Sequence, residues 1–265
     1  MSTLRFSRKQ LCVPYALFLI CFVVAPLIVI IYYAFTNGEG QFSLENLTGF
    51  FTSPNTIGTL AYSFAIACVS TAAALLLAYP IAYILARSEW KKKSIIVMIF
   101  VLPMWINFTL RLTALKEVLT LIEHNLAYYP FLNSVIGMVY DFLPFMILPL
   151  YNSMSKISAD VIDAARDLGA NQLQVFIKII MPLTVSGVLS GIIMVFVPAL
   201  TSFVISNLLG GGKVLLIGNV IEQEFMQNMD WHMGSGLSIV LMIFVIASMA
   251  FMNSHNKDGE GTAVW

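Results

Sequence analysis

One acid lies inside a stretch of sequence that is otherwise apolar. Asp141 stands within residues 135–154, and it is the only carboxylate placed inside a stretch of this kind. An acid in an apolar, membrane-length stretch is costly to bury, so it is by default a candidate functional group. A carboxylate beside aromatic faces suits an ammonium group, because both attract positive charge. Tyr140, Trp105 and Phe203 could supply such faces.

Structural roles compete with this binding role. Asp141 could pair with Arg111 or cap a helix that a proline interrupts, and each aromatic residue could simply pack in the core. Asn107 and Arg111, near the outer end of the preceding apolar stretch, carry the same ambiguity. The sequence leaves both interpretations of Asp141 open, and it favours core packing for each aromatic residue.

No group of residues has the spacing of a catalytic or metal site. The histidines are isolated in polar loops: His124, His232 and His255. The cysteines lie in apolar runs without disulfide or metal-ligand spacing, which indicates small core or lipid-facing residues. They are Cys12, Cys21 and Cys68. We therefore expect no enzyme activity and no bound metal in this chain.

A glycine-rich segment resembles a phosphate-binding loop only superficially. Gly210–Gly212 precede Lys213, but the phosphate-loop pattern requires a glycine at position 207 and a serine or threonine at 214. The chain has Asn207 and Val214 at those places. We expect no ATP site here, so any ATP hydrolysis must come from a partner.

The composition is that of a membrane protein. Hydrophobic residues make up 59% of the 265 residues and charged residues only 11%, whereas a soluble domain has about a quarter charged residues. Six stretches are long enough to cross a bilayer as helices, since lipid offers the backbone no hydrogen-bond partners. They are 11–33, 57–86, 94–114, 135–154, 179–206 and 236–252. The first is too long for a signal-peptide core, so we expect it to remain as a span.

Basic residues predict the orientation of these spans. One side would hold Arg5, Arg8, Lys9, Arg87, Lys91, Lys92, Lys93, Lys156, Arg166, Lys178 and Lys257, and the other only Arg111, Lys116 and Lys213. Both termini are then cytoplasmic: segment 1–10, a six-helix domain over 11–252, and a tail over 253–265. The formal net charge is zero, which argues against nucleic acid as a partner.

Prolines and glycines indicate where the helices bend or approach each other. Prolines interrupt spans three, four and five at Pro103, Pro144, Pro149 and Pro198, which weakly favours a pathway near these spans. Gly187 and Gly191 form a G-x-x-x-G face that could pack within this subunit or against a second one. The outer segment 207–235 is long, and we expect a short re-entrant or surface helix there.

The cytoplasmic segment 158–176 has the pattern of a docking helix. Ser158 can cap a helix whose apolar face, spaced i, i+3, i+4 and i+7, comprises Val161, Ala164, Ala165 and Leu168. Gly169 can adopt positive φ and end it, and a second short helix is expected over 171–176. An amphipathic helix lying on the membrane is the alternative, but a face built largely from alanine would insert weakly.

At this segment the chain resembles permease subunits of bacterial ABC importers. Their cytoplasmic signature is E-A-A, a glycine four residues later, and I-x-L-P after nine more. Here it appears as Asp163-Ala164-Ala165, Gly169, Ile179 and Met181-Pro182, with aspartate and methionine replacing glutamate and leucine. The resemblance implies a type I importer (MetI-like) core. It also implies that this helix docks in a groove of the ATPase subunit.

Three further runs resemble the first permease subunit of spermidine/putrescine importers. They are residues 143–151, 164–170 and 215–221. The resemblance implies a polyamine cargo, an extracytoplasmic polyamine-binding protein, a similar second permease in a heterodimer, and a bacterial inner-membrane location. Two copies of an ATPase subunit would bind ATP and Mg²⁺, leaving this chain without a cofactor.

Other functions remain possible from the sequence. The chain could be a permease for another small solute in the same importer class. An ion-coupled secondary transporter would show inverted repeats, and we find none. A membrane scaffold without transport activity would have no reason for the prolines or the docking pattern.

Overall fold

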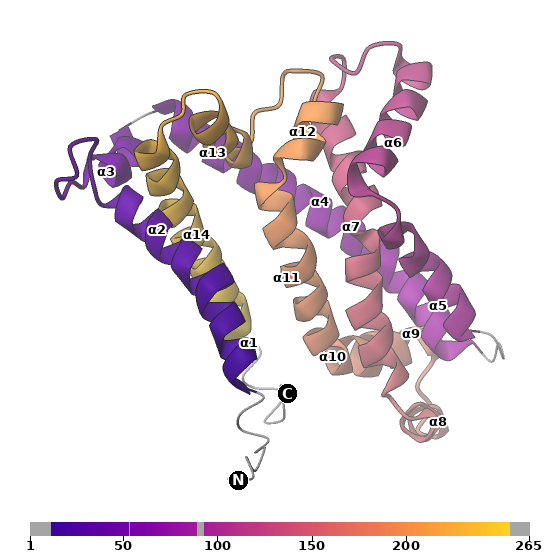
Figure 1. Cartoon of the computed structure of the whole chain (residues 1–265). Helices are drawn as coiled ribbons and strands as arrows, with labels where there is room; N and C mark the ends of the chain where they lie inside the picture. The colour runs from indigo at the N-terminus through magenta and orange to yellow at the C-terminus, as the bar shows by residue number, and fades with distance from the viewer. Residues whose placement is uncertain (1–11, 53, 89–92, 255–265) are drawn as a thin grey trace, which may run out of the picture. The chain divides into compact units, whose positions relative to one another are not determined.

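Helices form the architecture of the described residues, which are 12–52, 54–88 and 93–254 in this computed structural model (Figure 1). The one strand-like feature among these residues is an isolated antiparallel bridge between Thr36 and Phe42. The predicted all-α class is confirmed. The terminal segment 1–10 and all but two residues of the expected tail lie outside the described ranges, as do several basic residues used for the orientation.

Four helical segments are long and apolar enough to cross a membrane, and two bent helix pairs bring the total to as many as six. The four are Val13–Ala34, Thr56–Arg87, Pro130–Ser155 and Trp231–Ala250. The pairs are Ile95–Trp105 with Phe108–Glu123, bent by 94°, and Gln172–Leu183 with Val185–Thr201, bent by 63°. The third and fifth predicted spans are therefore present as bent helix pairs, in keeping with the interruption expected at Pro103.

The break in the third apolar stretch follows from Pro103 and Asn107. Helix α5 (Lys93–Val101) leads into a 3₁₀ turn, η3 (Leu102–Trp105), after which Ile106 is extended with ψ of 143°. Asn107 then caps α6 (Phe108–Glu123), because its side chain accepts a hydrogen bond from the Leu110 N–H at 3.2 Å. A new helix with its own cap has no need to continue the direction of the old one.

The fifth apolar stretch, together with the residues just before and after it, is divided into several short helical segments around one longer helix. It consists of α9 (Gln172–Val175), a π-helical turn η4 (Phe176–Ile180), α10 (Met181–Leu183), α11 (Val185–Thr201) and α12 (Phe203–Leu209). Pro182 and the π turn are the kind of features that bend helices. At the bend, the Thr184 hydroxyl lies 2.8 Å from Ile180 O and 2.8 Å from the Tyr79 hydroxyl.

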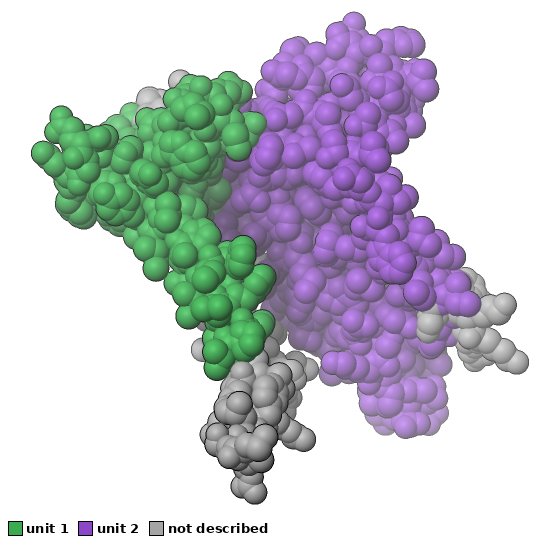
Figure 2. Space-filling model, viewed as in Figure 1, with its two compact units in different colours: residues 1–57, 221–244 green, residues 58–220, 245–265 purple. Residues whose placement is uncertain are grey.

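The described residues divide into two compact units (Figure 2). Unit 1 comprises residues up to 57 together with 221–244, and unit 2 comprises 58–220 and the residues from 245 onward. Helices α4 (Pro54–Arg87), α13 (Ile217–Met226) and α14 (Trp231–Ser254) contribute to both units. The helix α13 lies in the outer segment where a short helix was expected.

In unit 1 the first apolar stretch runs through α1 (Cys12–Leu19), a π turn η2 (Ile20–Val24) and α2 (Ala25–Ala34), and most of its side chains are exposed. Helix α3 (Glu45–Thr52) follows. The Asn46 amide donates to Ala34 O at 3.2 Å and Thr36 O at 2.8 Å. It thereby satisfies carbonyls at the end of α2 that lack helical partners.

The core of unit 2 is built by α7 (Pro130–Ser155) and α11, which pack along each other. A Cβ added to Gly187 would lie 2.5 Å from Ser153 Cβ, and one added to Gly191 would lie 2.6 Å from Met146 Sδ. Such distances leave no room for a side chain. The G-x-x-x-G face is therefore used within this subunit, which decides between the two alternatives that the sequence left open.

Two cysteines with described side chains lie outside the core. Cys21 and Cys68 are free and exposed on helix surfaces, as expected for lipid-facing residues. Cys12 belongs to α1, but its side chain lies outside the description.

Candidate coupling surface and candidate translocation pocket

The predicted docking segment forms a short helix with a sharp end. Helix α8 (Ala159–Asp167) has Ser158 at its N-cap position, although the serine side chain makes no capping hydrogen bond. Gly169 has φ of +84°. The N–H of Ala170 donates to Ala165 O at 3.0 Å and that of Gly169 to Arg166 O at 2.8 Å, the two bonds of a Schellman end. The expected glycine turn is present.

One side of α8 is anchored to the rest of unit 2. Ile162 and Ala165 are buried in a small cluster with Val175 and Ile180, against which Tyr83 and Ile157 also pack. The chain turns back at Gly169, so α9 covers this side of α8. The capping box of α9, in which Asn171 and Gln174 bond reciprocally at 2.8 and 2.9 Å, holds that return segment.

The other side of α8 is an open apolar surface. Val161 and Leu168 are 44% and 89% exposed, and Ala164 between them is exposed as well. We call Val161, Ala164 and Leu168 the α8 stripe. The prediction that Ala165 belongs to this apolar face is wrong, because α9 folds back over Ala165 and buries it. A short apolar stripe on an anchored helix is suited to insertion into a groove of another protein.

The remaining signature residues have different positions. Asp163 is exposed beside the stripe, and its carboxylate lies 3.4 Å from Arg166 Nη1, which is also exposed. Pro182 is exposed at the start of α10, next to the bend at Thr184. Pro182 therefore shapes the chain between α9 and α11 and does not belong to the α8 stripe.

Residues not selected from the sequence tie this element to the spans. Arg87 at the end of α4 donates to Ile157 O at 3.0 Å and to Met154 O at 3.2 Å, near the end of α7. The Phe176 ring makes edge contacts with Tyr79 and Tyr83 of α4, at 5.7 and 5.4 Å between centroids. Arg87 appeared in the sequence only as one of many basic loop residues, so its structural role had no visible signal.

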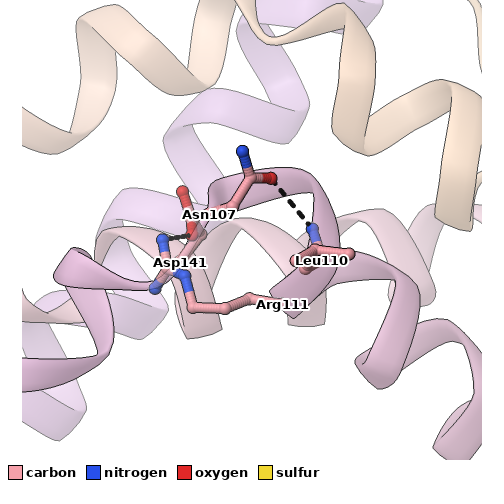
Figure 3. A network of polar contacts seen from close by, with 4 residues as sticks. All are labelled: Asn107, Leu110, Arg111 and Asp141. Atoms are coloured by element: carbon pink, nitrogen blue, oxygen red, sulfur yellow. Dashed lines mark hydrogen bonds and ion pairs between the residues drawn. The ribbon is translucent and has the colours of Figure 1, made fainter.

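The second site contains the acid from the apolar stretch. Asp141 of α7 forms an ion pair with Arg111 of α6 (Figure 3). Their side chains are only 4% and 8% exposed. The structural interpretation of Asp141 named this partner.

The ion pair lines a cavity of about 400 Å³. The breaks in the third and fifth apolar stretches meet at this cavity, because Met104 and Phe108 come from one and Pro198, Thr201 and Ser202 from the other. Phe142 and Phe145 of α7 complete its lining. The pair is therefore both a structural contact and part of a cavity wall.

The aromatic residues at this cavity are not the predicted ones. Trp105 is 82% exposed and Tyr140 44% exposed, and neither lines the cavity. Phe203 also lies outside it, and Asn107 is an exposed helix cap. The missed residues are Phe108, Phe142 and Phe145. Helical spacing could have found two of them, because Phe108 precedes Arg111 by three positions and Phe145 follows Asp141 by four.

A buried polar network holds the break between α11 and α12. The Asn219 side chain accepts from Ser206 Oγ at 2.7 Å and from Leu216 N at 2.8 Å, and it donates to Asn207 Oδ1 at 2.6 Å. Gly218 lies so close to the Thr201 carbonyl that a Cβ would clash with it. This explains two residues of the 215–221 run.

Comparisons with known proteins agree with this architecture. The family described as "Binding-protein-dependent transport system inner membrane component" matches residues 78–255. The chain is 36% identical over 245 residues to the spermidine/putrescine transport system permease protein PotB of Escherichia coli, covering 85% of this chain and 89% of that protein. It is 35% identical to the protein of that name in Haemophilus influenzae, covering 86% of each.

Solved structures show the same fold. A bacterial ABC transporter involved in the import of the acidic polysaccharide alginate aligns with a TM-score of 0.71 at 13% identity, covering 95% of both chains. The alginate transporter in complex with its pentasaccharide-bound periplasmic protein aligns with a TM-score of 0.73, covering 97% of this chain and 96% of that one. This chain is thus a multi-pass membrane protein that belongs to the family of inner membrane components of binding-protein-dependent transport systems.

Proposed function

We propose that this chain is the first of two similar permease subunits in an ABC importer for spermidine or putrescine. The relatives that match most of its length are named as permease proteins of spermidine/putrescine transport systems. The observation that carries the coupling role is the exposed α8 stripe on a helix anchored from behind. Transport proteins of this family depend on a binding protein, and here it would deliver a polyamine to the outer face.

The α8 stripe docks in a groove of the ATPase subunit, of which two copies serve the heterodimer of permeases. Those subunits hold ATP and Mg²⁺, so this chain needs no cofactor of its own. ATP binding draws the docked helices together. The segment just before α8 is tied to α4 through Arg87, and α8 itself packs on α9 and η4 through the buried cluster, so the movement reaches the bends in the spans.

Both termini lie in the cytoplasm and the chain resides in the bacterial inner membrane. In this orientation α8 is cytoplasmic and α6 lies toward the outer side, since α6 and α8 occupy opposite ends of unit 2 (Figure 1). The cavity at Arg111 and Asp141 is then a part of the pathway that the cargo passes. Tyr140, Trp105, Asn107 and Phe203 do not line this cavity, and they stay candidates for contact with the cargo elsewhere along the pathway.

Uptake of a panel of labelled solutes tests the substrate. Cells that lack other polyamine importers would express the complete system, and spermidine, putrescine, amino acids and anions would be offered separately. We expect uptake of polyamines alone, abolished by an ATPase variant that cannot hydrolyse ATP. Uptake of another solute would reject the polyamine assignment, and uptake without the ATPase would reject the importer class in favour of an ion-coupled transporter.

A further inference from the structure

The cavity at the ion pair has several features that attract a cation. The Asp141 carboxylate forms one wall. The end of α11 forms another through Pro198 and Thr201, and the C-terminal end of a helix carries a partial negative charge. Three phenylalanine rings present faces or edges to the same space. These parts of the lining therefore attract a positively charged group.

Arg111 is the one cationic residue in this lining. It comes from α6, as does Phe108, whereas the carboxylate, the helix end and the other two phenylalanines come from α7 and α11. The ion pair joins one guanidinium nitrogen, Nη2, to one carboxylate oxygen. The buried Nε of Arg111 has no hydrogen-bond partner among the described residues.

This geometry differs from that of an arginine that holds a carboxylate permanently. A guanidinium matches a carboxylate best through two parallel hydrogen bonds. A buried donor without a partner costs free energy, so the pair is less stable than a two-bond pair would be. The carboxylate nevertheless needs a cation at all times, because an unpaired charge in a buried site is strongly unfavourable.

We propose that Arg111 is a tethered substitute for the cargo: its guanidinium neutralises Asp141 when the pathway is empty, and a primary ammonium group of the polyamine displaces it during passage. The inference rests on the proposed function, because it requires a polycationic cargo. A tethered competitor acts at an effective concentration in the millimolar range or higher. The cargo is therefore held weakly, which suits a pathway better than a binding protein.

Thermal stability of the purified complex tests this exchange. The complex would contain both permeases and the ATPase in lipid nanodiscs, without binding protein, and spermidine would be titrated at constant ionic strength. A ligand at free concentration L that binds the folded state stabilises it by RT ln(1 + L/Kd), so the spermidine concentration that gives a fixed rise in melting temperature reports the affinity. We compare wild type with Arg111→Gln, Asp141→Asn, the double variant and Lys116→Gln. Lys116 is a matched control, because it removes one positive charge from the same helix outside the cavity.

Removing the tethered competitor should expose the ammonium site. We expect Arg111→Gln to melt at a lower temperature than wild type without spermidine, and to reach a given rise in melting temperature at a spermidine concentration at least tenfold lower. The double variant and Asp141→Asn should show no stabilisation. Lys116→Gln should respond as wild type does. Sodium chloride at equal ionic strength should not reproduce the effect.

Equal spermidine concentrations for the same rise in melting temperature in wild type and Arg111→Gln would overturn the exchange, and so would a double variant that still responds like Arg111→Gln. If Arg111→Gln does not assemble, Arg111→Lys replaces it. Lysine offers a point charge with fewer donors, so the spermidine concentration for the same rise should fall at least threefold, and an unchanged value would refute the proposal. Failure of the proposed function looks different, because the wild-type system would then import no polyamine.

Discussion

Replacing Gly169 by alanine tests whether the turn that ends α8 couples this chain to its ATPase. Gly169 has φ of +84°, and no atom lies within 4 Å of the place where a Cβ would be added. A side chain therefore has room, and the cost of the substitution comes from the backbone conformation alone. This makes the expected effect independent of side-chain size, so Gly169→Ala and Gly169→Leu should behave alike.

The magnitude follows from the two ways in which the chain can respond. If the turn keeps its shape, a left-handed conformation costs a residue with a Cβ about 1–2 kcal/mol. If the turn opens, the bonds of Ala170 to Ala165 and of Gly169 to Arg166 are lost, at about 1 kcal/mol each. Either route lowers the population of the docked geometry roughly 5- to 30-fold. Gly169→Asn should lose less, because asparagine adopts this conformation more readily.

The assay is spermidine uptake per ATP hydrolysed by the complete system in proteoliposomes. We expect Gly169→Ala to lower this ratio at least about fivefold at wild-type membrane expression. Gly212→Ala is the matched control, since Gly212 has φ of +73° and equally open surroundings in a loop away from α8. An unchanged ratio for Gly169→Ala, or an equal loss for Gly212→Ala, would show that the turn has no coupling role.

Three further tests address the docking residue, the packing of α11 and the buried network. Asp163→Glu should keep the ATPase in a pull-down, whereas Asp163→Lys should lose it; recovery at wild-type yield would remove Asp163 from the interface. Gly187→Leu should lower the melting temperature, because a side chain there collides with α7, while Gly58→Leu, with open space around it, should not. Asn219→Leu should cost about 3 kcal/mol or more by leaving buried partners unpaired. The control Asn228→Leu loses only one exposed bond, and an equal melting temperature for these two leucine variants would contradict the buried network.

Properties that depend on neighbouring residues in the chain could be predicted from the sequence. The six apolar stretches were found because a bilayer demands a certain length and composition of every span. The Gly169 turn was found for the same kind of reason, since a glycine after an amphipathic helix is a local signal. The docking segment and its family resemblance needed only residue types at given spacings.

Properties that depend on contacts between distant elements needed the tertiary structure. Ala165 and Ala164 are neighbours of the same type, yet the return of α9 buries one and leaves the other exposed. Prolines indicated where the helices could bend, but the contact between the Thr184 hydroxyl at the bend and the Tyr79 hydroxyl of α4 could not be read from the sequence. The direction of Asp141, its pairing with Arg111, and the phenylalanines around it were undetermined for this reason too. A span can rotate about its own axis without any change in sequence pattern, and only packing against other helices decides which face meets the cavity.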